Sequence, residues 1–228
     1  MNRQAILAVV LAGLAAPAVE AALIDLPYQI GGAYSVAATS IREARFAATV
    51  RQQYDFSCGS AALSTLLTHH YKFPVTEITV FEAMFASGDQ AKIRIERFSL
   101  LDMKRYLEAQ GFEADGFQEP LQKLVAANIP AIVLINEAGY NHFVVVKGVR
   151  GGRVLLGDPA GGTRAVSERA FKAAWTNQVL FVISNRQGDA SFNVASDWRV
   201  APSAPIGGLI RGDGLGGIVI PKLGPADF

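Results

Sequence analysis

The chain has 228 residues, of which 50% are hydrophobic and 18% charged, and its formal net charge at pH 7 is +1. This composition is typical of one folded domain with extensions and excludes a disordered or fibrous chain. The near-neutral charge gives no electrostatic reason to expect nucleic acid or an anionic membrane surface as a partner.

The first residues have the pattern of a secretory signal peptide. Arg3 gives a short positive start, residues 5–16 are apolar and uncharged, and residues 19–21 have the small-residue pattern that signal peptidase needs. We predict cleavage after Ala21, which leaves 207 residues (228 − 21) for a periplasmic protein. A retained membrane anchor is the alternative, although about 20 apolar residues are needed to span a bilayer. We expect no membrane span in the mature chain.

Residues 22–50 are mixed in pattern and predict a lead-in segment, whereas residues 51–184 predict the folded domain. The first half of that domain is helical in pattern. Ser57, Thr76 and Ser99 each precede an apolar segment of helical spacing, so we expect them to be N-caps. The helices predicted in this way run from Ser57 to about His70, over 76–88 and over 100–111, and a short helix follows near 120–128.

The second half of the domain contains short runs rich in β-branched residues, which predict strands. These cover residues 129–136, 142–149, 153–158 and 179–184, with a tight hairpin turn at Gly151 and Gly152. Helices followed by antiparallel strands predict an α+β fold. The Gly- and Pro-rich residues 185–228 predict a poorly ordered or partner-dependent extension.

Cys58 is the only cysteine, so it can form no internal disulfide. It lies where a loop meets the first predicted helix. The unpaired N–H groups and the dipole at a helix N-terminus favour a thiolate, which is the reactive form of cysteine. The alternative is that Cys58 is a small buried hydrophobic residue.

His142 and Asp158 start and end the two strands that flank the glycine turn. If these strands pair, the two side chains become neighbours. A thiol, a histidine and an acid that orients it are the nucleophile, base and orienter of acyl transfer. Gln52 or Gln53 could donate to the oxyanion, together with the Cys58 N–H. Taken singly, a strand-start histidine and an aspartate before proline are more often structural.

The remaining histidines, His69 and His70, are adjacent in sequence. Adjacent helical residues do not face the same point, so we interpret them as helix C-terminal residues stabilised by the dipole rather than as a metal pair. No metal and no cofactor is expected, because a thiolate supplies the nucleophile that a metal would otherwise generate.

The runs QQYDFSCGSAAL, FSLLDMKRYLEAQGF and NHFVVVKGVRGGRVLLGDPA resemble the peptidase C39 family over roughly residues 51–183. This resemblance implies a papain-like fold in which N-terminal helices pack on an antiparallel sheet. It also implies that Cys58 is the nucleophile and that His142 and Asp158 complete the triad. The family's oxyanion glutamine precedes the cysteine by six residues, which selects Gln52 over Gln53.

With its predicted signal peptide, the chain is similar to stand-alone C39-like proteins that accompany export systems, the functional amyloid (Fap) system among them. We therefore expect an exported cysteine peptidase that cuts a secreted peptide or protein through a thioester, with an amyloid subunit or export component as candidate partner. The alternative is a catalytically silent C39-like domain that binds an export substrate or secretion component. Hydrolysis and acyl transfer share the thioester step, so both stay open.

Overall fold

A computed structural model describes residues 22–25 and 35–202. The predicted signal peptide and residues 203–228 of the predicted extension lie outside the described residues. The chain divides into two units, residues 1–40 and 41–228. In the first unit, β1 (Ala22–Asp25) and β2 (Ser35–Ala38) pair as an antiparallel hairpin. The second unit contains every other element.

Three helices of the second unit begin directly after the N-caps predicted from the sequence, Ser57, Thr76 and Ser99. Thr76 accepts a hydrogen bond from the Thr79 N–H, and Ser99 forms a reciprocal capping box with Asp102. Ser57 is also an N-cap, but its hydroxyl hydrogen-bonds the Tyr54 backbone instead of the helix. The helices are α1 (Ile41–Phe46), α2 (Cys58–Thr65), its π-helical continuation η2 (Leu66–His70), α3 (Glu77–Ser87), α4 (Gln90–Glu96), α5 (Leu100–Ala109), α6 (Gln122–Ala127), α7 (Glu168–Ala174), the 3₁₀ turn η3 (Gln187–Asp189) and α8 (Ala195–Trp198).

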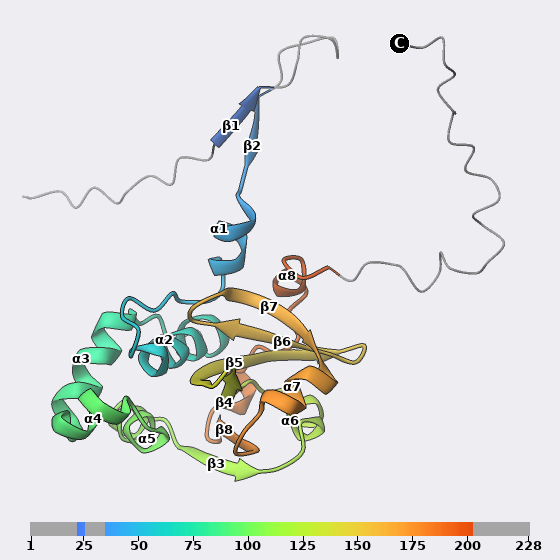
Figure 1. The fold of residues 1–228 in the computed structure, drawn as a ribbon. Helices are drawn as coiled ribbons and strands as arrows, with labels where there is room; N and C mark the ends of the chain where they lie inside the picture. Colours follow the sequence, from blue (N-terminus) through green and yellow to red (C-terminus); the bar gives the residue numbers. More distant parts are fainter. Residues whose placement is uncertain (1–21, 26–34, 203–228) are drawn as a thin grey trace, which may run out of the picture. The chain divides into compact units, whose positions relative to one another are not determined.

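The strands form one antiparallel sheet, in which the four predicted strands occupy the centre (Figure 1). Gly151 and Gly152 have φ values of 58° and 69° and form the predicted hairpin turn. The sequence analysis missed the two edge strands, because the runs ADGFQ and GTRAVS have no continuous apolar stretch. In spatial order the strands are β3 (Ala114–Gln118), β8 (Val179–Ile183), β4 (Ala131–Glu137), β5 (Tyr140–Arg150), β6 (Arg153–Asp158) and β7 (Gly162–Ser167).

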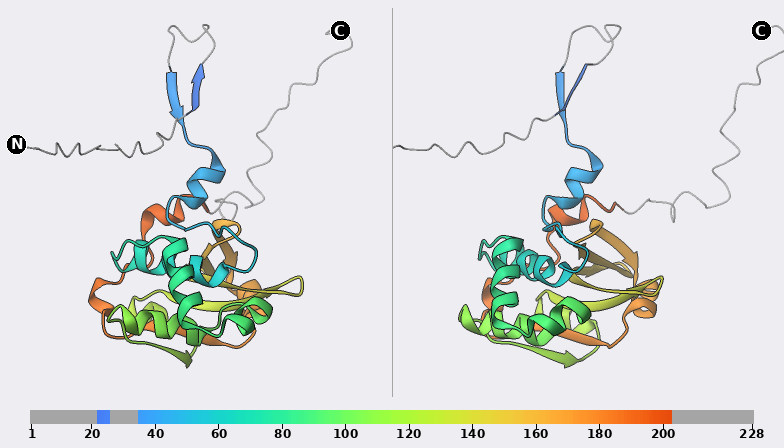
Figure 2. Two further views of the ribbon diagram at one scale, coloured as in Figure 1. Left: turned by 90° about the vertical axis from the view of Figure 1, so that its left-hand side faces the viewer. Right: turned by 60° about the vertical axis from the view of Figure 1, so that its left-hand side comes forward.

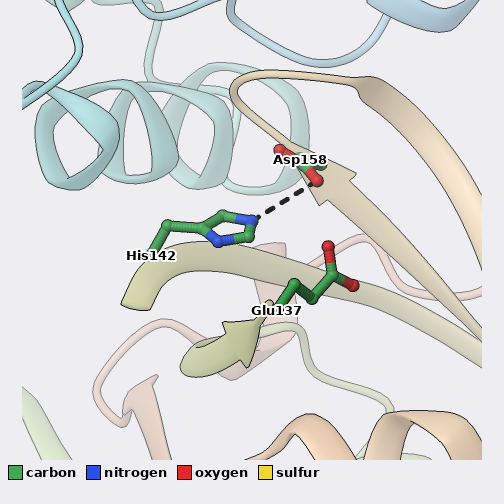
Figure 3. Close-up of side chains that lie close together, drawn as sticks. All are labelled: Glu137, His142 and Asp158. Carbon is green, nitrogen blue, oxygen red and sulfur yellow. Dashed lines mark hydrogen bonds and ion pairs between the residues drawn. The ribbon is translucent and has the colours of Figure 1, made fainter. Parts of the chain in front are cut away.

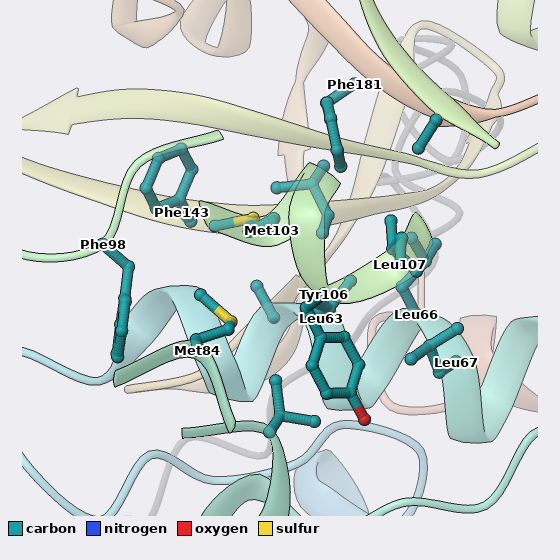
Figure 4. Close-up of a cluster of buried hydrophobic side chains, with 14 of the residues drawn as sticks. Leu63, Leu66, Leu67, Met84, Phe98, Met103, Tyr106, Leu107, Phe143 and Phe181 are labelled. Carbon is teal, nitrogen blue, oxygen red and sulfur yellow. The ribbon is translucent and has the colours of Figure 1, made fainter. Parts of the chain in front are cut away.

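Helices cover both faces of this sheet (Figures 1 and 2). On one face, side chains of α2, α3 and α5 pack against Phe143, Val145 and Phe181 of the sheet (Figure 4). On the other face, α6 and α7 pack against Val144 and Val146. Successive residues of β5 are thus buried on opposite faces, which explains its unbroken apolar run. The predicted packing of N-terminal helices on an antiparallel sheet is confirmed, and α6 and α7 add a further layer.

Residues 185–202 differ from the predicted loose extension. Phe192 and Trp198 are buried, and the Ser191 and Asn193 N–H groups donate to the His70 and Lys147 carbonyls. Isolated aromatic residues in a polar segment have no periodicity, so the sequence does not reveal this packing. Among residues 22–25 and 35–202, no helix combines the length and apolar character needed to cross a membrane.

Candidate active site

Cys58 is the first residue of α2 and is only 3% exposed. A Cβ atom on Gly59 would lie 3.1 Å from the Phe98 Cβ, so glycine permits the first turn of α2 to pack closely. Burial raises the pKa of the Cys58 thiol, and hydrogen bonding with the Phe143 backbone and the charge of Arg97 offset this only in part. The predicted preference for a thiolate is therefore wrong for the substrate-free structure. Burial disfavours the charged thiolate by more than the N-terminus of α2 stabilises it.

His142 and Asp158 are neighbours, as predicted. Val146 pairs with Leu156 in the β5–β6 ladder, and side chains two residues apart share a face, so His142 and Asp158 lie on one face of the sheet. The His142 Nε2 atom lies 3.4 Å from Asp158 Oδ2 (Figure 3). His142 is 7% exposed, and its buried Nδ1 atom has no hydrogen-bond partner among the residues that the structure describes. Thus Nε2 contacts a carboxylate, and Nδ1 is available for another partner.

The Asp158 carboxylate is held on both oxygens. Oδ1 accepts from the Ala160 and Gly161 N–H groups at 2.9 and 3.2 Å, and Oδ2 accepts from Arg164 Nε at 3.0 Å. Burial alone would raise the pKa of Asp158. The bonds from His142 and Ala160 and the Arg164 charge instead hold the pKa of Asp158 well below its usual range. Asp158 therefore stays ionised.

Gln52 lies in the same cavity as His142 and Asp158. Its N–H donates to the Pro159 carbonyl at 3.1 Å, and its side-chain amide donates to the Tyr54 carbonyl at 3.2 Å. Gln53 is exposed and does not line this cavity, which favours the predicted choice of Gln52. The cavity has a volume of about 750 Å³ and is lined by Gln52, Asp55, Arg97, Glu137, Tyr140, His142, Asp158, Ala160, Gly161 and Arg164.

Cys58 lines an adjoining cavity of about 380 Å³. Arg97 and Tyr140 line both cavities. The Tyr140 hydroxyl donates to the Asp55 carbonyl at 2.8 Å, and the Arg97 guanidinium lies 4.4 Å from the centre of the Tyr140 ring. The structure thus brings Gln52, His142 and Asp158 into one cavity and places Cys58 in the next, beside the backbone of Phe143.

Glu137, His142 and Asp158 place potential metal-ligand atoms within 4.8 Å of one another (Figure 3). Arg164 donates to Glu137 at 2.8 Å as well as to Asp158, so a guanidinium already compensates both carboxylates. We therefore assign no metal to this cluster. Neither Arg164 nor Glu137 was predicted from the sequence, because Arg164 lies on the unrecognised edge strand β7 and Glu137 ends β4 one residue past the predicted strand.

His70 corrects a further expectation. Its ring is 1% exposed, and Nδ1 lies 2.6 Å from the Ser191 carbonyl oxygen. Burial lowers the pKa of His70 to about 4, and the nearby Lys147 adds to this effect. His70 is therefore neutral at pH 7, and a favourable interaction of its charge with the helix dipole is excluded.

Comparison with known proteins identifies the family. The model of the peptidase C39 family matches residues 47–187, which is more than half of the chain. The chain belongs to the peptidase C39 family. C39 members are cysteine peptidases, in agreement with the enzyme class expected from the sequence.

Two curated relatives of this C39 peptidase are both named probable functional amyloid protease FapD. The protein from Pseudomonas aeruginosa is 43% identical over 153 residues, which cover 67% of this chain and 68% of the relative. The protein from Pseudomonas fluorescens is 43% identical over 144 residues, or 63% of each chain. The chain thus spans about two thirds of the length of these relatives.

A solved structure supports the fold of this C39 peptidase. The peptidase domain of Streptococcus ComA, described as a bi-functional ABC transporter involved in a quorum-sensing pathway, matches with a TM-score of 0.50 at 19% identity. The match covers 60% of this chain and 96% of the ComA domain. This similarity confirms the predicted α+β, papain-like fold.

Proposed function

We propose that this C39 peptidase cleaves a peptide bond in a secreted or exported protein, with Cys58 as nucleophile, His142 as base, Asp158 as orienter and Gln52 as oxyanion donor. The observation that carries the proposal is the state of the His142 ring. Nε2 faces an ionised carboxylate, and the buried Nδ1 has no hydrogen-bond partner within residues 22–25 and 35–202. A buried polar atom without a partner is costly, which favours a functional reason for it.

The proposed reaction uses these groups in two steps. Nδ1 of His142 takes the thiol proton, and the Cys58 sulfur attacks the scissile carbonyl carbon. The Gln52 amide and the Cys58 N–H stabilise the oxyanion, and the imidazolium then protonates the leaving amine. Water, deprotonated by His142, attacks the resulting thioester and releases the carboxylate product and the free thiol. Asp158 stays ionised and stabilises the imidazolium.

The resting geometry requires three adjustments before this reaction. Cys58 is nearly inaccessible, no hydrogen bond joins its thiol to His142 Nδ1 in the described part of the chain, and the Gln52 amide donates to the Tyr54 carbonyl. Substrate would have to separate Tyr140 and Arg97, bring the His142 ring to the thiol and turn the Gln52 amide toward the oxyanion. Catalytic hydrogen bonds often tighten only in the complex with substrate, so the free structure is compatible with this sequence of events.

The relatives support a substrate class. Both FapD proteins are named as functional amyloid proteases, which supports an amyloid subunit or another component of a functional amyloid export system as the partner of this chain. The predicted signal peptide supports a periplasmic location. Transfer of the acyl group to an amine instead of water would use the same thioester.

Mass spectrometry of secreted proteins co-expressed with the full chain tests the proposal. Cys58→Ala should abolish processing, and His142→Ala should nearly do so. Gln52→Ala should lower the rate by about 100- to 1000-fold, because one oxyanion donor is lost. Gln53→Ala is the matched control and should process normally, because Gln53 is exposed. Normal processing by both Cys58→Ala and His142→Ala would refute the peptidase proposal and favour a binding domain.

A further inference from the structure

Arg164 joins two carboxylates that come from different strands. Leu156 pairs with Arg164 in the β6–β7 ladder and Ile135 pairs with His142 in the β4–β5 ladder. Because alternate residues share a face, Glu137, His142, Asp158 and Arg164 all project from the same face of the sheet. The Arg164 side chain is 25% exposed, against 7% for Asp158 and 44% for Glu137. Its charge is therefore partly shielded from solvent.

The guanidinium contacts these partners with two different nitrogens. Nε donates to Asp158 at 3.0 Å and Nη2 donates to Glu137 at 2.8 Å. Both bonds are shorter than the 3.4 Å contact between Asp158 and His142. Arg164 and the Ala160 and Gly161 N–H groups therefore fix the carboxylate that faces the imidazole. A lysine at this position would supply the positive charge but not the planar guanidinium, whose separate N–H groups donate to the two carboxylates.

Charged groups surround the imidazole. Arg164 is the cation that bridges the carboxylates of Glu137 and Asp158. The other charged or titratable residues that line the two cavities are Asp55, Arg97 and Tyr140 beside His142, and Cys58 and Glu96 in the adjoining cavity.

We infer that Arg164 is a positioning residue for the proposed peptidase reaction. It holds Asp158 in the position in which Oδ2 faces the His142 ring, so that the imidazole keeps one orientation for exchanging a proton with Cys58. This inference rests on the proposed function, because it concerns the same site. Arg164 touches neither the substrate nor the thiol in this role and acts through Asp158.

The rate at which a co-expressed secreted protein is processed, followed by mass spectrometry with Cys58 present, tests the positioning role. Arg164→Gln should lower this rate by about ten-fold, because Asp158 loses the charge-assisted hydrogen bond that holds it against His142. Glu137→Gln keeps the bond between Arg164 and Asp158 and should lower the rate much less. Urea denaturation of each variant measures its folding separately.

Rescue by Arg164→Lys is the decisive outcome. This variant keeps a positive charge beside Asp158, so it should process more substrate than Arg164→Gln when the two variants have similar free energies of unfolding. Equal processing rates in the parent and Arg164→Gln, or in Arg164→Lys and Arg164→Gln, would overturn the inference. Failure of the proposed function would show separately, as normal processing by Cys58→Ala.

Discussion

Cys58 and His70 lie in one continuous helical segment, and burial moves their pKa values in opposite directions. The thiol is neutral when protonated, so burial raises the pKa of Cys58. The imidazole is neutral when deprotonated, so burial lowers the pKa of His70 to about 4. In both residues, the buried environment favours the uncharged form.

His70 should make stability depend on pH. The folded pKa of about 4 is below the ordinary value of 6.5, so below pH 6.5 the unfolded chain binds a proton that the folded chain does not. The contribution of His70 is present above pH 6.5 and is lost as the pH falls toward 4. We expect the free energy of unfolding, measured by urea denaturation, to fall by roughly 3 kcal/mol through this window.

His70→Asn isolates this contribution. An asparagine amide can donate to the Ser191 carbonyl, which now accepts from the imidazole, but it does not titrate. The variant should be less stable at pH 7, because it leaves a small cavity, and its stability should change less between pH 6.5 and 4. If the free energy of unfolding of His70→Asn falls as much between pH 6.5 and 4 as that of the wild type, other groups cause the pH dependence.

At the scale of elements, the β4–β5 hairpin is tied to the loop that precedes α2. Tyr140 at the tip of the hairpin donates to the Asp55 carbonyl, and Arg97 at the end of α4 donates to the Asn141 carbonyl at 3.3 Å. Arg97 has φ = 70°, a left-handed conformation that is unfavourable for a side chain of its size. These contacts connect three elements around the nearly inaccessible Cys58.

Tyr140→Phe should therefore expose Cys58 more often. The variant loses one hydrogen bond, worth about 1 kcal/mol, which corresponds to roughly a five-fold higher rate of alkylation by iodoacetamide if opening limits the reaction. Mass spectrometry can follow the reaction at the single cysteine. Tyr54→Phe is the matched control on the facing loop, because no hydrogen bond of its hydroxyl is found in the described part of the chain. An unchanged rate in Tyr140→Phe would show that this bond does not restrict access.

At the scale of the whole molecule, Lys147 joins segments that are distant in sequence. This residue of β5 is fully buried, and its ammonium donates to the Ala48 carbonyl at 2.7 Å and to the Thr163 hydroxyl at 3.3 Å. It also forms a 2.8 Å ion pair with Asp197 of α8. Burial lowers the pKa of Lys147, and Asp197 opposes this change. The Lys147 ammonium thus connects the centre of the sheet to the segment before α2 and to α8.

Asp197→Asn should destabilise the protein. It leaves a buried ammonium without its counter-charge, and loss of one partner from a buried pair costs about 3 kcal/mol. Urea denaturation at pH 7 measures this loss. Asp189→Asn, at an exposed acid of the same C-terminal segment, should change the free energy of unfolding by less than about 0.5 kcal/mol. Equal effects of the two substitutions would show that the Lys147–Asp197 pair does not anchor α8.

Much of the fold follows from local patterns in the sequence. The caps at Thr76 and Ser99 and the turn at Gly151 and Gly152 depend on residues a few positions apart, so propensity and turn chemistry suffice to predict them. The pairing of His142 with Asp158 is also local, since one short turn sets the hairpin. The edge strands β3 and β7 were missed because neither has a continuous apolar run, and β3 also pairs with β8, which is distant in the sequence.

The sequence by itself determined that the predicted helices precede the four central strands, and it determined the family and the candidate residues Cys58, Gln52, His142 and Asp158. Only the tertiary structure decided that burial raises the pKa of Cys58, that Arg164 bridges Asp158 and Glu137, and that residues 185–202 pack on the domain. The physical reason is that desolvation and cross-strand contacts depend on groups far apart in the chain. Spacing along the sequence cannot reveal which groups exclude water from a side chain or which groups bind the same charged residue.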